Sequence, residues 1–140
     1  MWMAEVANAI AGEFSDLMDP AEAARLGVRL FVAVLVGAAI GYDRERNASS
    51  AGLRTHMLVA VGATLFVIVP QHAGFEAADM SRVVQGLIAG IGFLGAGAIL
   101  ARGEIVRGLT TAASVWSVAG IGLAVGGGLY TPAVAATAAS

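Results

Sequence analysis

Apolar residues run along this chain in four long blocks separated by short polar stretches. The blocks cover about 20–43, 52–70, 82–101 and 109–129. At about 1.5 Å of rise per residue, helices of these lengths match the roughly 30 Å hydrocarbon core of a bilayer. A further small-residue run over 131–140 predicts the start of a fifth helix. We therefore expect an all-α membrane protein, built as a bundle of four to five transmembrane helices.

The segment that precedes these blocks, 1–19, follows a different pattern. Its acidic residues lie off one helical stripe. The apolar residues on that stripe are Trp2, Val6, Ile10, Phe14 and Leu17. That stripe predicts an amphipathic helix lying in the membrane interface, with a frayed terminus as the alternative. The transmembrane domain then covers 20–140, and Asp19, Pro20 and Glu22 mark its start as N-cap, N1 and N3.

Composition supports this class and excludes several functions. Only 13% of the 140 residues are charged and 58% are hydrophobic, whereas soluble domains carry roughly 25% charged residues. The net charge of −2 argues against nucleic-acid binding, and the absence of cysteine excludes disulfides and cysteine-based zinc sites. No nucleophilic, phosphate-loop or dinucleotide motif occurs, and His56 and His72 lie at opposite ends of one block. We expect neither an enzyme nor a cofactor.

Arginine residues set the expected orientation. The first interhelical loop contains Arg44, Arg46 and Arg54, and the third contains Arg102 and Arg107. The second loop contains only Arg82. The positive-inside rule then places the first and third loops in the cytoplasm and the N-terminus outside. Arg25 and Arg29, in the first turns of the first helix, weigh the other way.

Glycine dominates the third block. It contains Gly86, Gly90, Gly92, Gly95 and Gly97. Gly86 and Gly90 form a GxxxG pair, which predicts close packing against another helix. The alternative is local unwinding near 95–97, which would free carbonyls to line an ion or substrate path.

Hydroxyl residues mark the fourth block. Thr110, Ser114 and Ser117 are spaced four and three apart, so they share one helical face. Hydrogen bonding between helices explains them, and a polar conduit is the alternative. Thr111 belongs to the sequence 108–111, GLTT, which parallels 52–55, GLRT. Both open predicted helices, which indicates either parallel internal repeats or coincidence in a glycine-rich chain.

A charged cluster is the main candidate for a gate or a docking site. It comprises Asp43, Arg44, Glu45, Arg54 and His56, with Arg107 on the other cytoplasmic loop. An Asp43–Arg54 bridge that pins two helices is the structural alternative. Asp43 and Glu45 are the candidates for a Mg²⁺ site, although two carboxylates among four cations suit a hard metal poorly. Arg54 and Arg107 also stand at helix starts, which favour anions or lipid headgroups. Ser49 or Ser50 is expected to cap the second helix.

Four blocks in this order resemble the membrane domain of the MgtC/SapB family over about 25–130. They are 41–46 (GYDRER), 51–56 (AGLRTH), 92–99 (GFLGAGAI) and 106–116 (VRGLTTAASVW). The family usually has Gly-Leu-Glu-Arg-Glu where this chain has Gly-Tyr-Asp-Arg-Glu. The side chain that carries the carboxylate at Asp43 is therefore shorter than the family's glutamate.

The resemblance implies a bacterial inner-membrane protein of about five spans, linked to low-Mg²⁺ adaptation and to virulence through survival in macrophages. It also implies a membrane-protein partner such as the proton-translocating ATP synthase. Many members carry a cytoplasmic C-terminal domain, so we expect either a short or a truncated member. Two hypotheses follow: a non-enzymatic regulator that binds another membrane complex, and a Mg²⁺ or proton transporter or channel. Exposed small-residue faces also predict a homo-oligomer in the lipid bilayer.

Overall fold

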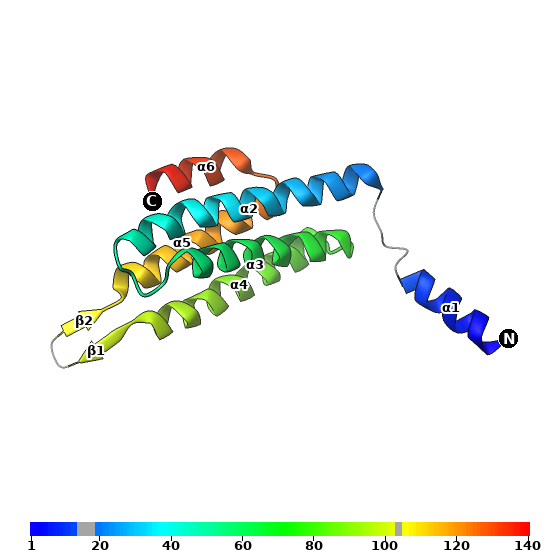
Figure 1. Ribbon diagram of the computed structural model, residues 1–140, viewed down its shortest axis with the longest axis horizontal. Helices are drawn as coiled ribbons and strands as arrows, with labels where there is room; N and C mark the ends of the chain where they lie inside the picture. The colour runs from blue at the N-terminus through cyan, green and yellow to red at the C-terminus, as the bar shows by residue number, and fades with distance from the viewer. Residues whose placement is uncertain (14–18, 103–104) are drawn as a thin grey trace.

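The computed structural model describes residues 1–13, 19–102 and 105–140. Its elements run in the order α1 Trp2–Glu13, α2 Pro20–Arg46, α3 Leu53–His72, α4 Ala77–Ala98, β1 Leu100–Arg102, β2 Ile105–Arg107, α5 Leu109–Gly126 and α6 Tyr130–Ala139 (Figure 1). Helices α2, α3, α4 and α5 are long and apolar enough to cross a membrane. The expected all-α membrane bundle is thus confirmed, and α6 is its fifth helix.

Helix α3 is the centre of the bundle. It packs most extensively against α2 and α5 and more lightly against α4, while α4 packs mainly on α5 (Figure 1). The short α6 contacts α5 and α2. We call one end of the bundle the hairpin end: there α2 finishes, α3 and α5 begin, and β1 pairs antiparallel with β2. We call the opposite end, where α2 begins and α3 and α5 finish, the Arg29 end.

Two glycine pairs allow this close packing. A Cβ on Gly37 would lie 2.7 Å from the carbonyl oxygen of His56, and one on Gly41 would lie 2.7 Å from Leu53 Cα. On the other side of α3, a Cβ on Gly122 would collide with the carbonyl of Ala60, and Gly126 is equally tight. Because only glycine fits these positions, α2 and α5 each carry a GxxxG pair that seats them directly on the α3 backbone.

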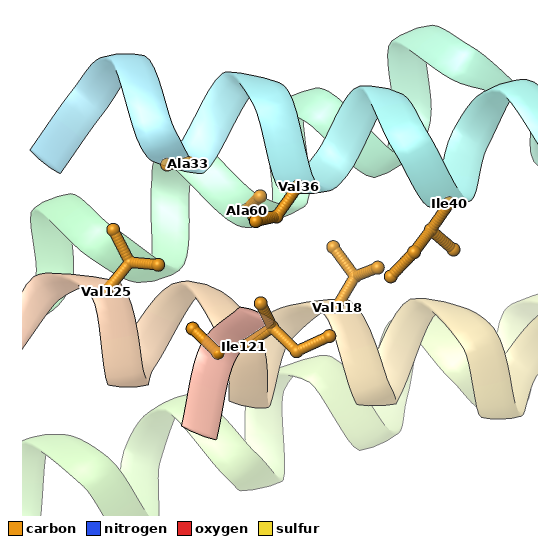
Figure 2. Close-up of a cluster of buried hydrophobic side chains, with 8 residues drawn as sticks. Ala33, Val36, Ile40, Ala60, Val118, Ile121 and Val125 are labelled. Atoms are coloured by element: carbon orange, nitrogen blue, oxygen red, sulfur yellow. The ribbon is translucent and has the colours of Figure 1, made fainter. Parts of the chain in front are cut away.

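Small and β-branched residues fill the space between these helices (Figure 2). The buried cluster takes residues from four helices: Ala33, Val36 and Ile40 of α2, Ala60 of α3, Val118, Ile121 and Val125 of α5, and Ala133 of α6. Val118 and Val125 are fully buried. The middle of the bundle is therefore a packed apolar core.

The structure differs from the sequence-based expectation in three places. Helix α4 begins at Ala77 rather than near 82, because Glu76 takes the N-cap position and Asp79 lies in the first turn. Strand β1 begins at Leu100, inside the block expected to be helical to 101, and β2 lies within the turn expected at 102–108. Helix α1 forms with every residue exposed, but Phe14 and Leu17 of the predicted amphipathic stripe lie outside the described residues.

The predicted packing role of the α4 glycines holds for Gly95 alone. A Cβ on Gly95 would be in ordinary contact with Ala112 of α5, whereas Gly86, Gly90, Gly92 and Gly97 have nothing within 4 Å of that position. Helix α4 also remains helical through Ala98, so the alternative of unwinding near 95–97 is wrong. No described residue therefore packs within contact distance of the Gly86 and Gly90 Cβ positions.

Candidate functional site at the hairpin end

A carboxylate from α2 caps the start of α3. Glu45, in the last turn of α2, accepts a hydrogen bond from the backbone N–H of Leu53 at 2.8 Å. Helix N-termini carry unpaired N–H groups and a partial positive charge, so a carboxylate is well placed there. The contact ties the two helices together directly across their loop.

Gly52 makes that cap sterically available. It is the N-cap of α3, and a Cβ at this position would lie 2.7 Å from Glu45 Oε2. Gly108 is the matching N-cap of α5, with φ of +90° and a backbone so close to Ala98 that a Cβ would collide with its carbonyl. Both predicted helix starts are therefore glycine caps, each demanded by a close approach.

A buried histidine sits one turn further into α3. His56 is fully buried, and its Nδ1 lies 2.8 Å from the carbonyl oxygen of Gly52. That carbonyl can only accept, so Nδ1 carries a hydrogen. Its Nε2 lies 3.1 Å from Ser114 Oγ on α5, and Ser114 Oγ in turn donates to the carbonyl of Thr111 at 2.9 Å.

These contacts join α3 to α5 through one hydroxyl group. With a hydrogen on Nδ1, Nε2 of the neutral imidazole is an acceptor, and the Ser114 hydroxyl at 3.1 Å can donate to it. The same hydroxyl lies 2.9 Å from the Thr111 carbonyl, so two acceptors share its one hydrogen.

A second hydroxyl pair extends the same network toward the loop after α2. Ser49 Oγ and Thr111 Oγ1 lie 2.9 Å apart, and Thr111 is buried. Ser49 thus binds α5, and Gly52 is the N-cap of α3, so the expectation that Ser49 or Ser50 caps α3 is wrong. We call Glu45, Ser49, His56, Thr111 and Ser114 the polar seam.

The other members of the predicted cluster lie around this seam. Asp43 accepts from the Asn47 side chain at 3.2 Å and is exposed, as are Arg54 and Arg107. Among the residues that the structure describes, the ion pair is Asp79–Arg82, so the alternative of an Asp43–Arg54 bridge is wrong. Arg44 is half-buried, and its Nε has no partner in the described part of the chain.

The carboxylates proposed for Mg²⁺ have other partners here. Glu45 is held by the Leu53 N–H, while Asp43 is held by Asn47. The described residues contain no group of three or more His, Asp or Glu side chains that could hold a metal ion.

The hydroxyl face of α5 is split. Ser114 joins the seam and Ser117 is half-buried, but Thr110 is exposed. The neighbour Thr111, on the α3-facing side, takes the buried position that the spacing assigned to Thr110. Sequence reasoning also missed Thr64, fully buried in mid-bundle, which donates to the Gly122 carbonyl at 2.8 Å. Thr64 is the single hydroxyl residue in the apolar run 57–69, and that is the signal that marks it.

Comparison with known proteins agrees with the four sequence blocks. A sequence model of the MgtC family matches residues 30–140, which include α3, α4, α5, α6 and most of α2. The chain belongs to the MgtC family. With four helices long and apolar enough to span a membrane, it is a multi-pass membrane protein of MgtC type.

Curated relatives from three organisms show the same kinship. Protein SrpB of Synechococcus elongatus is 48% identical over 75% of this chain and 65% of its own length. The protein named "Putative magnesium transporter YhiD" of Escherichia coli strain K12 is 41% identical over 74% and 51%. Protein MgtC of Salmonella typhimurium is 44% identical over 79% and 47%. The chain thus spans about half to two-thirds of these relatives, and no solved structure matches it.

Proposed function

We propose that this domain is a non-enzymatic regulator in a bacterial inner membrane, which acts in Mg²⁺ adaptation by binding another membrane complex through α4. By the positive-inside rule, its hairpin end faces the cytoplasm, because that end has more arginines than the Arg29 end. The hairpin end has Arg44, Arg46, Arg54, Arg102 and Arg107, and the Arg29 end has Arg25, Arg29 and Arg82. The name "Putative magnesium transporter YhiD" of one relative supports the link to magnesium. The family's implied partner is the proton-translocating ATP synthase.

The open glycine pair of α4 carries this proposal. At 100° per residue, Gly86, Gly90 and Gly97 fall within an arc of about 40°, and all three are exposed. Elsewhere in the chain, the pairs Gly37–Gly41 and Gly122–Gly126 each seat a helix. The pair on α4 has the same spacing, and no helix among the described residues packs on it.

A groove accompanies that pair. It lies between α3 and α4, has a volume of about 460 Å³ and is apolar, with Gly86 and Gly90 along it and Phe66 and Leu94 at its sides. Within a bilayer, small residues let a partner helix come close enough for backbone contact. We therefore assign the groove to a transmembrane helix of the partner complex.

Co-purification from native membranes tests the proposal. Gly86→Leu with Gly90→Leu should remove the co-purifying partner while the domain itself remains in the membrane. Gly92→Leu is the matched control, because Gly92 is exposed on a different side of the same helix. Recovery of a second copy alone would assign the groove to a homo-oligomer, and recovery of the domain alone would refute regulation by docking.

A small-ion transporter is the second candidate, favoured by the buried polar contact between His56 and Ser114 and by the name of YhiD. Val118, Ile121 and Val125 form a packed apolar core below the seam, which argues against a path through a single copy. Reconstitution into liposomes with a Mg²⁺- or proton-sensitive dye separates the two. Flux above empty liposomes that is lost in His56→Ala would favour transport.

A further inference from the structure

The Arg29 end contains a pocket of different character from the polar seam. It has a volume of about 390 Å³ and lies between the first turns of α2 and the last turn of α3. Five of its lining side chains are charged or polar: Glu22, Arg25, Arg29, Gln71 and His72. Its size falls in the range that proteins use for small ligands.

Arg29 is held in place at the back of this pocket. Its Nη1 donates to the Gly126 carbonyl at 2.9 Å and to Gln71 Oε1 at 3.3 Å. Both bonds use one nitrogen, so Nε and Nη2 keep hydrogens with no acceptor among the described residues. The bond to Oε1 also leaves the Gln71 amide nitrogen available as a donor. The guanidinium is thus oriented before any ligand arrives.

Arg25 and His72 add unused polar groups at the rim. Within the described ranges, Arg25 makes neither a hydrogen bond nor an ion pair, and its side chain lines the same pocket. His72 Nδ1 donates to the Ile68 carbonyl at 3.0 Å, which leaves Nε2 unused. Two guanidinium groups against the single carboxylate of Glu22 favour an anion, and phosphate suits paired arginines.

An apolar groove continues from the pocket along the bundle. A second hollow of about 480 Å³ shares Glu22, Leu26, Ile68 and His72 with the first and extends past Leu65 and Val69 of α3. Leu65 and Val69 are exposed toward the surrounding membrane. A ligand that fits both hollows has a charged head and an apolar tail, and bilayer phospholipids have that form.

We propose that this pocket binds a phospholipid: the phosphate contacts Arg25 and Arg29, and one acyl chain lies along Leu65 and Val69. Glu22 places one negative charge beside the two arginines. That charge favours a headgroup that also carries a primary amine, as in phosphatidylethanolamine, over a purely anionic one. The proposal is independent of docking at α4.

Native mass spectrometry of the purified full chain in detergent tests this, with phosphatidylethanolamine, phosphatidylglycerol and inorganic phosphate as separate probes. The wild-type chain should bind phosphatidylethanolamine most tightly. Arg25→Gln should weaken that binding by about tenfold or more, as expected for the loss of a charge-assisted hydrogen bond. Glu22→Gln should shift the preference toward phosphatidylglycerol.

Arg82→Gln is the matched control, because Arg82 is exposed, pairs with Asp79 and lies outside the pocket. Equal loss in Arg82→Gln and Arg25→Gln would overturn the site. Binding of inorganic phosphate that displaces the lipid would overturn a lipid as the ligand. Preference of the wild-type chain for phosphatidylglycerol would overturn the role assigned to Glu22.

Discussion

The two ends of the bundle use their polar groups in opposite ways. At the hairpin end, Glu45, His56 and Ser114 bind one another's helices, and the buried side-chain groups described there are paired except Nε of Arg44. At the Arg29 end, Arg29 pins α2 to α5, but Arg25 and one nitrogen of His72 face a pocket. The hairpin end is closed by its own side chains, and the Arg29 end is open to a ligand.

The comparison shows that residues in the sequence motifs hold the helices together, whereas the open pocket is lined by residues outside those motifs. The sequence blocks 41–46 and 51–56 meet at the hairpin end, where they supply a cap, a close glycine contact and a buried histidine. Their chemistry holds α2, α3 and α5 together. The Arg29 end has no such block, yet it contains the polar pocket. In this chain, the motif blocks identify where helices are held together, and unpaired polar side chains identify the open pocket.

The largest effect is expected from filling a glycine contact near the hairpin end. Gly41→Leu should prevent α2 from seating on α3, because even a Cβ would lie 2.7 Å from Leu53 Cα. Overpacking typically costs about 1–3 kcal/mol, and we expect a loss of about 4 kcal/mol or more here, because the atoms in the way are backbone atoms of Leu53. Thermal unfolding in detergent measures it. Gly92→Leu, with open space around it, should unfold near the wild-type temperature, and equal loss in both would refute the contact.

Alanine variants of His56 and His72 compare the contributions of the two ends to stability. His56→Ala removes a fully buried ring and leaves Ser114 without its partner on α3, so the free energy of unfolding should fall by about 2–4 kcal/mol. His72→Ala removes an exposed ring that makes one hydrogen bond within its own helix. The free energy of unfolding should therefore change by less than about 0.5 kcal/mol. Similar losses in both variants would contradict the contrast between a closed and an open end.

The two arginines of the Arg29 end should separate stability from binding. Arg29→Gln loses the bond to the Gly126 carbonyl at the end of α5 and should cost about 1–2 kcal/mol of stability. Arg25→Gln should leave stability within about 0.5 kcal/mol, since no protein partner is lost among the described residues. Unfolding in delipidated detergent shows this; a large loss in Arg25→Gln would mean that the residue is structural.

The smallest effect is expected at the cap. Glu45→Gln keeps an oxygen for the Leu53 N–H but removes the charge that interacts with the α3 dipole. Stability should fall by about 0.3–1 kcal/mol, and less at high salt. Glu45→Ala, which also removes the acceptor, should cost more. A Glu45→Gln variant as unstable as Glu45→Ala would show that the charge, and not the hydrogen bond, dominates.

Hydropathy and helix-start patterns predicted the four spanning helices and the helix starts near Gly52 and Gly108, because these features depend on local residues, whereas the cap of α3 was expected at Ser49 or Ser50. Pairing between distant segments was harder. The structure joins Glu45 to Leu53 and Ser49 to Thr111, whereas sequence reasoning paired Asp43 with Arg54. Both carboxylates lie near the end of α2, and only the packing angle of α2 on α3 decides which one reaches.

Glycine spacing alone also did not reveal which pairs are buried. Gly37–Gly41, Gly86–Gly90 and Gly122–Gly126 all have the same spacing, yet α3 covers the first and third while the second is open. The difference arises from the position of each helix in the bundle. Because none of the described residues makes the predicted contact with Gly86 and Gly90, those residues become the strongest argument for an external partner.

Site-specific crosslinking tests the docking face most directly. The chain has no cysteine, so Gly90→Cys and Gly92→Cys each introduce a single thiol on α4, and both positions have open space. In native membranes, a thiol at position 90 should crosslink to a partner helix, and a thiol at position 92 should crosslink far less. Equal crosslinking at both positions, or none at either, would contradict docking through the Gly86–Gly90 groove.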